Sequence, residues 1–221
     1  MGTAKTQRLS EFKNVKIKPD LFYVGGGTVI GNGYGLSNWG DSIPNFIYQE
    51  NENYPVSEKY LKENHTPEAV VNRIVESGAI AVKTYYEPGF DPTKPPLPTP
   101  SEELIETIKK EAHKRNLVLV VHGNSLDAHS FLANAEVDVI AHGLWNWGDE
   151  RLENNGLIPK EVTETLDTEI ENKVGYIATL QVINGLNSLT TPNFLSDPEL
   201  KNVLPKDLIS YYEKNTEKMY I

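Results

Sequence analysis

The chain has 221 residues, of which 38% are hydrophobic and 24% are charged. This composition predicts one soluble globular domain over residues 1–221, because disordered chains lack such a core and a membrane span needs about 18 consecutive apolar residues. The net charge of −10 argues against nucleic acid as a partner. The absence of cysteine leaves histidine, carboxylate and modified lysine side chains as the groups that could bind a metal.

The first residues, MGTAKTQRLSEFK, are polar and lack the apolar stretch of a secretory signal. The cytoplasm is therefore the default location, and no membrane partner is expected. If the chain is a fragment of a longer protein, that parent could still be exported.

Apolar runs predict five strands that alternate with helices. The expected strands cover residues 21–30, 79–86, 117–123, 137–143 and 175–183, and the expected helices cover 67–77, 101–116, 125–136, 159–173 and 196–220. Residues 31–64 and the proline-rich 87–100 are predicted loops. Strands and helices in this alternation predict parallel pairing, and hence an α/β fold that is either an open sheet or a (β/α) barrel.

Three ionisable residues, Lys83, His122 and His142, fall at or near the carboxyl ends of successive predicted strands. Functional groups gather at this end of parallel sheets, because the loops leave a cleft there. Neutral imidazoles bind Zn, Fe, Ni or Mn, whereas a lysine binds a cation only when it is deprotonated or carboxylated. Each residue alone favours a structural role, but the coincidence of three favours a shared site.

The other histidines and the glycines do not indicate a functional site. His65, His113 and His129 lie before or within predicted helices, which favours structural or surface roles. The glycines of residues 25–35 do not form the G-x-G-x-x-G motif of a nucleotide site, and no P-loop lysine follows them. A G-x-S-x-G motif for a serine nucleophile is absent, as is a carboxylate pair with glycosidase spacing.

Three segments resemble the central strands of the amidohydrolase superfamily, in its imidazolonepropionase-like and prolidase-like branch. They are GAIAVKT, SEELIETIKKEAHKRNLVLVVHG and ANAEVDVIAHG. The resemblance extends over roughly residues 20–221 and implies a TIM-barrel-like (β/α) fold. The first H-x-H strand of that family and the aspartate of its last strand have no counterpart here, so the resemblance implies a partial barrel that covers strands three to seven.

The resemblance also implies a metal site and an activity. Lys83 would be carboxylated by CO2 and would bridge two divalent metals, Zn first with Mn, Fe or Ni as alternatives, and His122 and His142 would be further ligands. His142 would also polarise the scissile carbonyl, and Tyr85 and Tyr86 would contact the substrate. The implied reaction is hydrolysis of amide or peptide-like C–N bonds in small molecules such as N-acyl amino acids, dipeptides or cyclic amides.

Two alternatives stay open. A non-catalytic or split-barrel fragment would associate with itself or with a complementing chain, because an incomplete barrel exposes strand edges. On this reasoning the 221-residue chain is expected to be inactive by itself. A different (β/α) enzyme would use Lys83 to form a Schiff base with a carbonyl substrate.

Overall fold

A computed structural model describes residues 14–16, 22–24, 29–35, 45–49, 61–89, 93–147, 157–189, 191 and 193–215. The chain forms two compact units, residues 1–178 and residues 179–221. Each unit is described by itself below.

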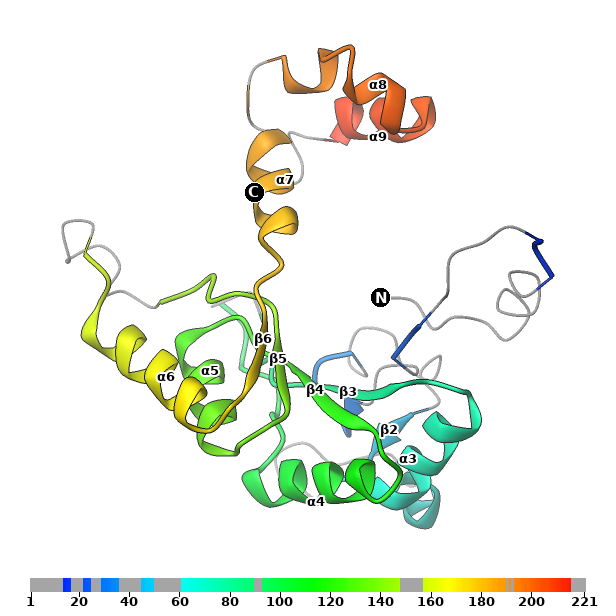
Figure 1. The fold of residues 1–221 in the computed structure, drawn as a ribbon, viewed down its shortest axis with the longest axis vertical. Coiled ribbons are helices and arrows are strands. Elements are labelled where there is room, and N and C mark those ends of the chain that lie inside the picture. The colour runs from blue at the N-terminus through cyan, green and yellow to red at the C-terminus, as the bar shows by residue number, and fades with distance from the viewer. Residues whose placement is uncertain are drawn as a thin grey trace. The chain divides into compact units, whose positions relative to one another are not determined.

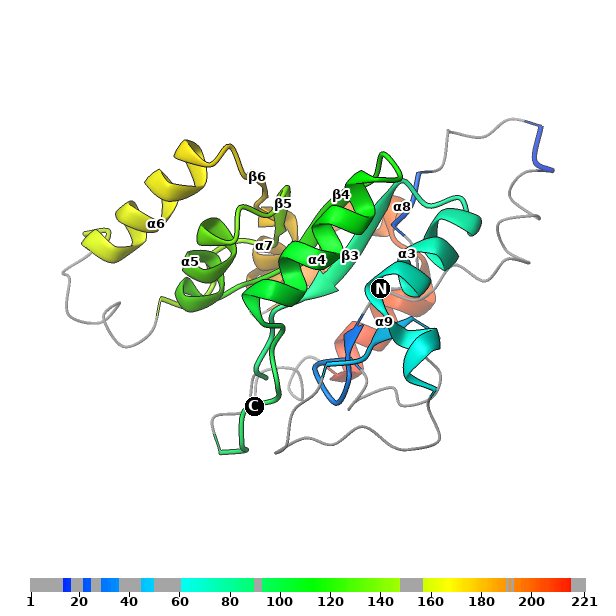
Figure 2. The same cartoon turned by 90° about the horizontal axis from the view of Figure 1, so that it is seen from below.

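The first unit is built on a parallel sheet of four strands in the order β3-β4-β5-β6. The strands are β3 (Ala81–Tyr85), β4 (Val118–His122), β5 (Val139–Ala141) and β6 (Gly175–Ile177), and the helices between them are α4 (Glu102–His113), α5 (Leu126–Asn134) and α6 (Lys160–Glu171). Figures 1 and 2 show α3, α4, α5 and α6 on the same side of this sheet. Strand, helix and parallel strand follow one another as predicted, which confirms the α/β fold class.

The segment before β3 differs from the single strand predicted at residues 21–30. Val24 forms a parallel bridge with Ala81, which places it beside β3. Residues 25–28 lie outside the described part of the chain, and β1 (Val29–Ile30) pairs instead with β2 (Phe46–Ile47) in a separate parallel sheet. The short strand β2 and the 3-10 helix η2 (Lys62–His65) were not predicted within the loop at residues 31–64.

Hydroxyl side chains begin three helices where the sequence predicts them. Thr66 accepts a hydrogen bond from the Ala69 amide at 3.2 Å and begins α3 (Pro67–Glu76). Ser101 and Ser125 accept equivalent bonds, each of 3.2 Å, at the starts of α4 and α5. Each cap satisfies an amide that has no partner within its helix, typically contributing about 1 kcal/mol.

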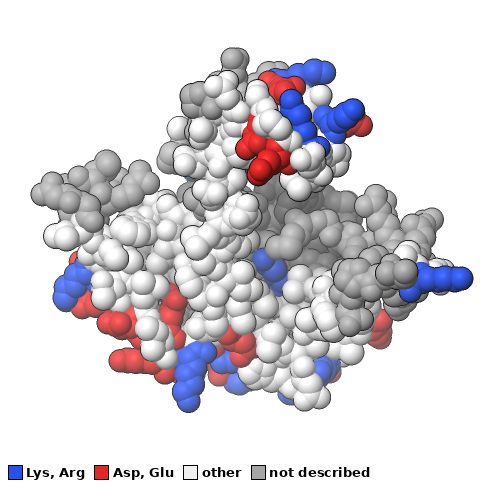
Figure 3. All heavy atoms as spheres, turned by 45° about the horizontal axis from the view of Figure 1, so that its top comes forward, with Lys and Arg blue, Asp and Glu red and all other residues white. Residues whose placement is uncertain are grey.

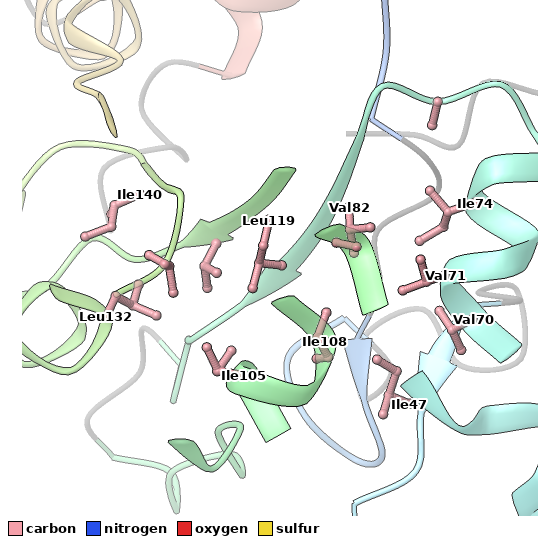
Figure 4. Packing of buried hydrophobic residues seen from close by; sticks show 14 residues of the cluster. Ile47, Val70, Val71, Ile74, Val82, Ile105, Ile108, Leu119, Leu132 and Ile140 are labelled. Carbon is pink, nitrogen blue, oxygen red and sulfur yellow. The ribbon is translucent and has the colours of Figure 1, made fainter. Parts of the chain in front are cut away.

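The main hydrophobic core lies between the sheet and the helices (Figure 4). Alternate residues of the strands, such as Val82, Leu119 and Ile140, point toward apolar residues of the helices, such as Ile74 and Ile108. Successive side chains of a strand point to opposite faces. The intervening residues of β3 and β4 therefore face away from the helices.

The second unit is helical. It contains α7 (Leu180–Leu189), η4 (Phe194–Ser196), α8 (Leu200–Val203) and α9 (Lys206–Asn215). The strand predicted at residues 175–183 was therefore too long, because β6 ends at Ile177 and α7 begins at Leu180. Thr179 lies between them with a φ of 48°, a left-handed conformation that ends the extended backbone.

Charged side chains of both signs gather on the helical side of the first unit (Figure 3). Lys110 pairs with Glu106 and Lys160 with Glu164, each at 2.6 Å and four residues apart along a helix. Such exposed pairs contribute only a few tenths of a kcal/mol. No helix in the described part of the chain combines the length and apolarity that a bilayer-spanning segment requires.

Candidate functional site

The register of the sheet places Lys83, Tyr85 and His122 on the face away from the helices. Tyr85 is level with His122, and Lys83 is level with Val120, one layer deeper in the sheet. Lys83 is thus the central residue of β3 rather than its last one. Small and β-branched residues of the three strands, Ala81, Val120 and Ala141, pack together on the same face.

His122 and His142 lie edge to face, with their ring centroids 4.7 Å apart. Simple alternation would put His142 on the helix side with Ile140. Its φ of 88° interrupts the extended backbone after β5, and the ring comes to lie against His122. Positive φ is uncommon for a residue with a side chain and is found at functional sites more often than elsewhere.

Lys83 is buried, with 3% of its surface exposed. Its Nζ lies 5.8 Å from the centroid of the Tyr85 ring. No carboxylate pairs with this amine among the residues that the structure describes. Burial therefore lowers the pKa of Lys83 to about 8, because the ammonium form loses its hydration.

His142 is kept neutral by its surroundings. Burial, and then the positive charges of Lys83 and His122, lower the pKa of His142 to about 4. We refer to Lys83, His122 and His142 together as the cluster. The buried Nδ1 of His142 has no hydrogen-bond partner in the described part of the chain.

Glu87 joins the cluster, although the sequence analysis did not single it out. The carboxyl is 3% exposed; its Oε2 lies 3.0 Å from Nε2 of His122, and its Oε1 accepts the Gly89 amide at 2.8 Å. An ionised carboxylate only accepts hydrogen bonds, so Nε2 of His122 is the donor and the lone pair of a neutral ring lies on Nδ1. The signal in the sequence is the two-residue spacing of Lys83, Tyr85 and Glu87.

Two tyrosines stand beside His122. Tyr34 stacks on the His122 ring at 5.8 Å with an interplanar angle of 13°, and the Tyr34 and Tyr85 rings are 5.7 Å apart. Burial is the main cause that raises the pKa of both phenols, reinforced at Tyr34 by the charge of Glu87 and at Tyr85 by Tyr34. Tyr34 lies in the predicted loop at residues 31–64, where no pattern singled out this residue.

Tyr86 lies on the helix side of the sheet, away from the cluster. Its ring stacks on Phe131 at 4.5 Å and packs against the main hydrophobic core. The alternation of a strand explains this separation, because neighbouring residues face opposite sides of the sheet. Of the two tyrosines predicted to contact a substrate, the structure brings only Tyr85 to the cluster.

The other histidines make structural contacts away from this cluster. His65 Nδ1 lies 2.9 Å from the Phe46 carbonyl oxygen, and His113 Nε2 lies 2.8 Å from Asp138 Oδ2. His129 is fully buried, and its Nδ1 lies 2.7 Å from Glu169 Oε1 on the next helix. These contacts confirm the structural roles expected for the three residues.

The donor groups of the cluster fit a divalent metal if Lys83 contributes. The described residues contain no group of three His, Asp or Glu side chains arranged to hold a metal ion. The cluster does offer two imidazoles, an unpartnered buried nitrogen on His142 and a buried amine without a counter-ion. A carboxylated lysine would add oxygen ligands to those nitrogens, which is a donor set suited to Zn or Mn.

Comparisons with solved structures address the fold. The match to a structure of a Xaa-Pro dipeptidase with bound methionine covers 96% of this chain and 46% of the dipeptidase chain, at a TM-score of 0.52 and 18% identity. The match to A. niger ochratoxinase covers 96% of this chain and 45% of the ochratoxinase chain, at a TM-score of 0.52 and 14% identity. The chain therefore shares the fold of about half of each of these two structures.

This similarity confirms, at the level of the fold, the family resemblance and the partial (β/α) barrel expected from the sequence. The chain spans less than half the length of the dipeptidase and of the ochratoxinase. No protein-family model matches the chain, and no curated protein matches it either.

Proposed function

We propose that this chain carries the metal-binding part of a hydrolase that cleaves amide or peptide-like C–N bonds. The observation that supports this most strongly is the convergence of Lys83, His122 and His142 on the face away from the helices, with the His142 and His122 rings 4.7 Å apart. Lys83, His122 and His142 are the proposed metal ligands. The substrate class is small amides such as N-acyl amino acids, dipeptides or cyclic amides.

Lys83 acts as a ligand after it reacts with CO2. The neutral amine attacks the carbon of CO2, an N–C bond forms, and one proton leaves to solvent, so that the product is an anionic carbamate with two oxygens. Burial without a counter-ion supports this chemistry, because it favours the neutral amine that reacts. The carbamate would also place a negative charge where the cluster now has a cation.

The histidines and Glu87 hold the remaining groups in place. Glu87 fixes the His122 ring by accepting from Nε2, which leaves Nδ1 for a ligand. A neutral His142 offers either a ligand nitrogen or a hydrogen bond to the substrate carbonyl. A divalent metal, when bound, supplies Lewis-acid polarisation of that carbonyl and a nucleophile at neutral pH.

Metal content tests the proposal. The chain, freed of metal and reconstituted with Zn or Mn in bicarbonate, should bind the metal near stoichiometry by elemental analysis. Lys83→Met, His122→Ala and His142→Ala should each weaken binding by more than about 100-fold, because even a residue that only orients a ligand is typically worth about 10–100-fold.

His113→Ala is the matched control, because His113 pairs with Asp138 at 2.8 Å away from the cluster and should leave metal content unchanged. Carbon-13 NMR with labelled bicarbonate should give a carbamate signal that Lys83→Met removes. Reconstituted protein that holds no metal and shows no carbamate contradicts the proposal.

A second candidate function is association with a complementing chain or with a second copy. The supporting observation is strand β6, which pairs only with β5 among the described residues and has half-exposed Tyr176 and Ile177. An open strand edge with apolar side chains is a template for another strand. This function and the hydrolase function are compatible, because a partner could also complete the metal site.

A further inference from the structure

The loops that follow β4 and β5 are fastened together next to the cluster. The Asn124 carbonyl accepts from the amides of Trp145 and Asn146, at 2.8 and 3.2 Å, and the Leu126 amide donates to the Asn146 carbonyl at 2.9 Å. These bonds hold the side chains of Asn124 and Trp145 on a rigid frame at the carboxyl ends of the two strands. Neither side chain has a part in the proposed metal site.

Both side chains carry a buried N–H group without an acceptor. Asn124 is 8% exposed, and its Nδ2 has no hydrogen-bond partner in the described part of the chain. Nε1 of Trp145 is also buried and also has no partner there. A buried donor left without an acceptor is unfavourable by about 1–3 kcal/mol, so such groups almost always meet an acceptor in the working protein.

The two donors border the same side of the cluster. A Cβ on Gly123 would lie 2.9 Å from Leu132 Cδ1, so position 123 faces α5 and alternation places Asn124 on the face of His122. The Trp145 ring lies 5.6 Å from the His142 ring. Its Nε1 lies only 3.4 Å from where a Cβ of Gly143 would stand, next to His142.

The chemistry of these groups selects an oxygen acceptor. An amide N–H and an indole N–H are neutral donors, which suit a carbonyl or carboxylate oxygen. Glu87, the carboxylate of the cluster, already accepts from His122 and Gly89. The nearby Lys83 further favours an electron-rich group.

We infer that Asn124 and Trp145 form a subsite beside His142 that binds a carbonyl or carboxylate oxygen of the substrate. The substrate is identified through the proposed hydrolase function, on which this inference rests. In an N-acyl amino acid, the oxygen would belong to the part of the molecule beyond the scissile bond. The subsite would then select compounds that carry a second hydrogen-bond acceptor in addition to the scissile carbonyl.

The indole N–H signals in proton–nitrogen NMR spectra provide a direct test. Nε1 of Trp147 already donates to the Leu144 carbonyl at 3.0 Å and is an internal control. Trp145→Phe and Trp147→Phe assign the signals. N-acetylglycine should move the Trp145 signal downfield in a saturable way and leave that of Trp147 in place, while methylammonium chloride, which offers no acceptor, should move neither.

Asn124→Ala should weaken the apparent affinity for N-acetylglycine about 3–10-fold, the value of one hydrogen bond. Trp145→Phe, which keeps a ring and removes the donor, should weaken it similarly when the acetyl signal of the ligand is followed, whereas Trp147→Phe should not. N-acetylglycinamide separates the two acceptors. If it binds as N-acetylglycine does, the acceptor is a carbonyl; if it does not, the acceptor is the carboxylate.

A Trp145 signal that stays in place at saturating concentrations of both compounds overturns the inference, and an equal response to methylammonium does so too. The metal content of the same samples separates this outcome from failure of the proposed function. Bound metal without an indole response overturns the subsite alone. An indole response without bound metal supports the donor pair and contradicts the metal site.

Discussion

His142 reaches the cluster because of its backbone and not because of strand alternation. With extended geometry it would share the helix-facing side of Ile140, and the φ of 88° brings its ring to His122 instead. The sequence predicted that the three residues meet, because all three lie near carboxyl ends of parallel strands. It could not predict the conformation that makes His142 meet His122, because a positive φ at a histidine has no signature in composition or periodicity.

Glu87 could not be predicted from the sequence for a different reason. It stands at the start of a proline-rich loop, where strand periodicity is no longer expected to hold, yet it continues the alternation of Lys83 and Tyr85. The Tyr86 amide donates to the His122 carbonyl at 2.8 Å, so pairing with β4 extends past the last residue of β3. This additional backbone hydrogen bond places Glu87 beside His122.

We predict that Glu87→Gln weakens metal binding about 10–100-fold without unfolding the chain. Glutamine keeps the size of the side chain but loses the charge that orients the His122 ring. Competition with a chelator measures the affinity. Glu106→Gln, which removes an exposed carboxylate that pairs only with Lys110, is the control and should have no effect. An affinity that is equal in wild type and Glu87→Gln contradicts the orienting role.

At the level of elements, the helices after the first strands were the most predictable part. The capping residues Thr66 and Ser101 placed the starts of α3 and α4 correctly, and the helix predicted from residue 125 is α5. The end of β6 was not predictable. Residues 175–183 form an almost continuous apolar run, and such a run does not distinguish a strand from a helix.

Gly143 lies just after β5, next to His142, and we predict that Gly143→Ala destabilises the first unit by about 1–3 kcal/mol. The new Cβ would lie 2.8 Å from the Ala178 carbonyl oxygen, and backbone must move to relieve that contact. The hydrogen bond of 2.9 Å from the His142 amide to the Ile177 carbonyl would weaken as these two segments of the backbone move apart. Urea titration followed by circular dichroism measures the loss.

Gly185→Ala is the matched control for that substitution. Gly185 lies within α7, and nothing is within 4 Å of its added Cβ. Alanine there should stabilise the helix by about 0.5–1 kcal/mol. Equal midpoints for wild type and Gly143→Ala would show that the backbone beside His142 tolerates a side chain.

At the scale of the whole molecule, we expect the open edge of the sheet at β6 to govern association. Gly175 and Ile177 bond toward β5, so the intervening Tyr176 directs its backbone groups to the opposite side. No further strand pairs with β6 in the described ranges. An edge of this kind favours pairing with another chain.

We predict that the chain self-associates with rising concentration in sedimentation velocity, and that Ile177→Lys weakens this association tenfold or more. Ile177 is 49% exposed, and replacing its apolar surface at an interface forfeits about 1.5–3 kcal/mol, which corresponds to roughly 10–100-fold. Val203→Lys is the control, because Val203 is 75% exposed and belongs to α8 in the helical second unit. A chain that stays monomeric at every concentration contradicts the prediction.

The alternation of the strands has a consequence for evolution. Side chains of the hydrophobic core point toward the helices, and those of the proposed site point away from them. We therefore expect substitutions at these two sets of positions to act almost independently. Laboratory evolution could therefore diversify Tyr85, Asn124 and Trp145 for new substrates without touching the packing beneath the helices. Stabilising substitutions could in turn be collected separately at the helix-facing positions Val82, Leu119, Val121 and Ile140.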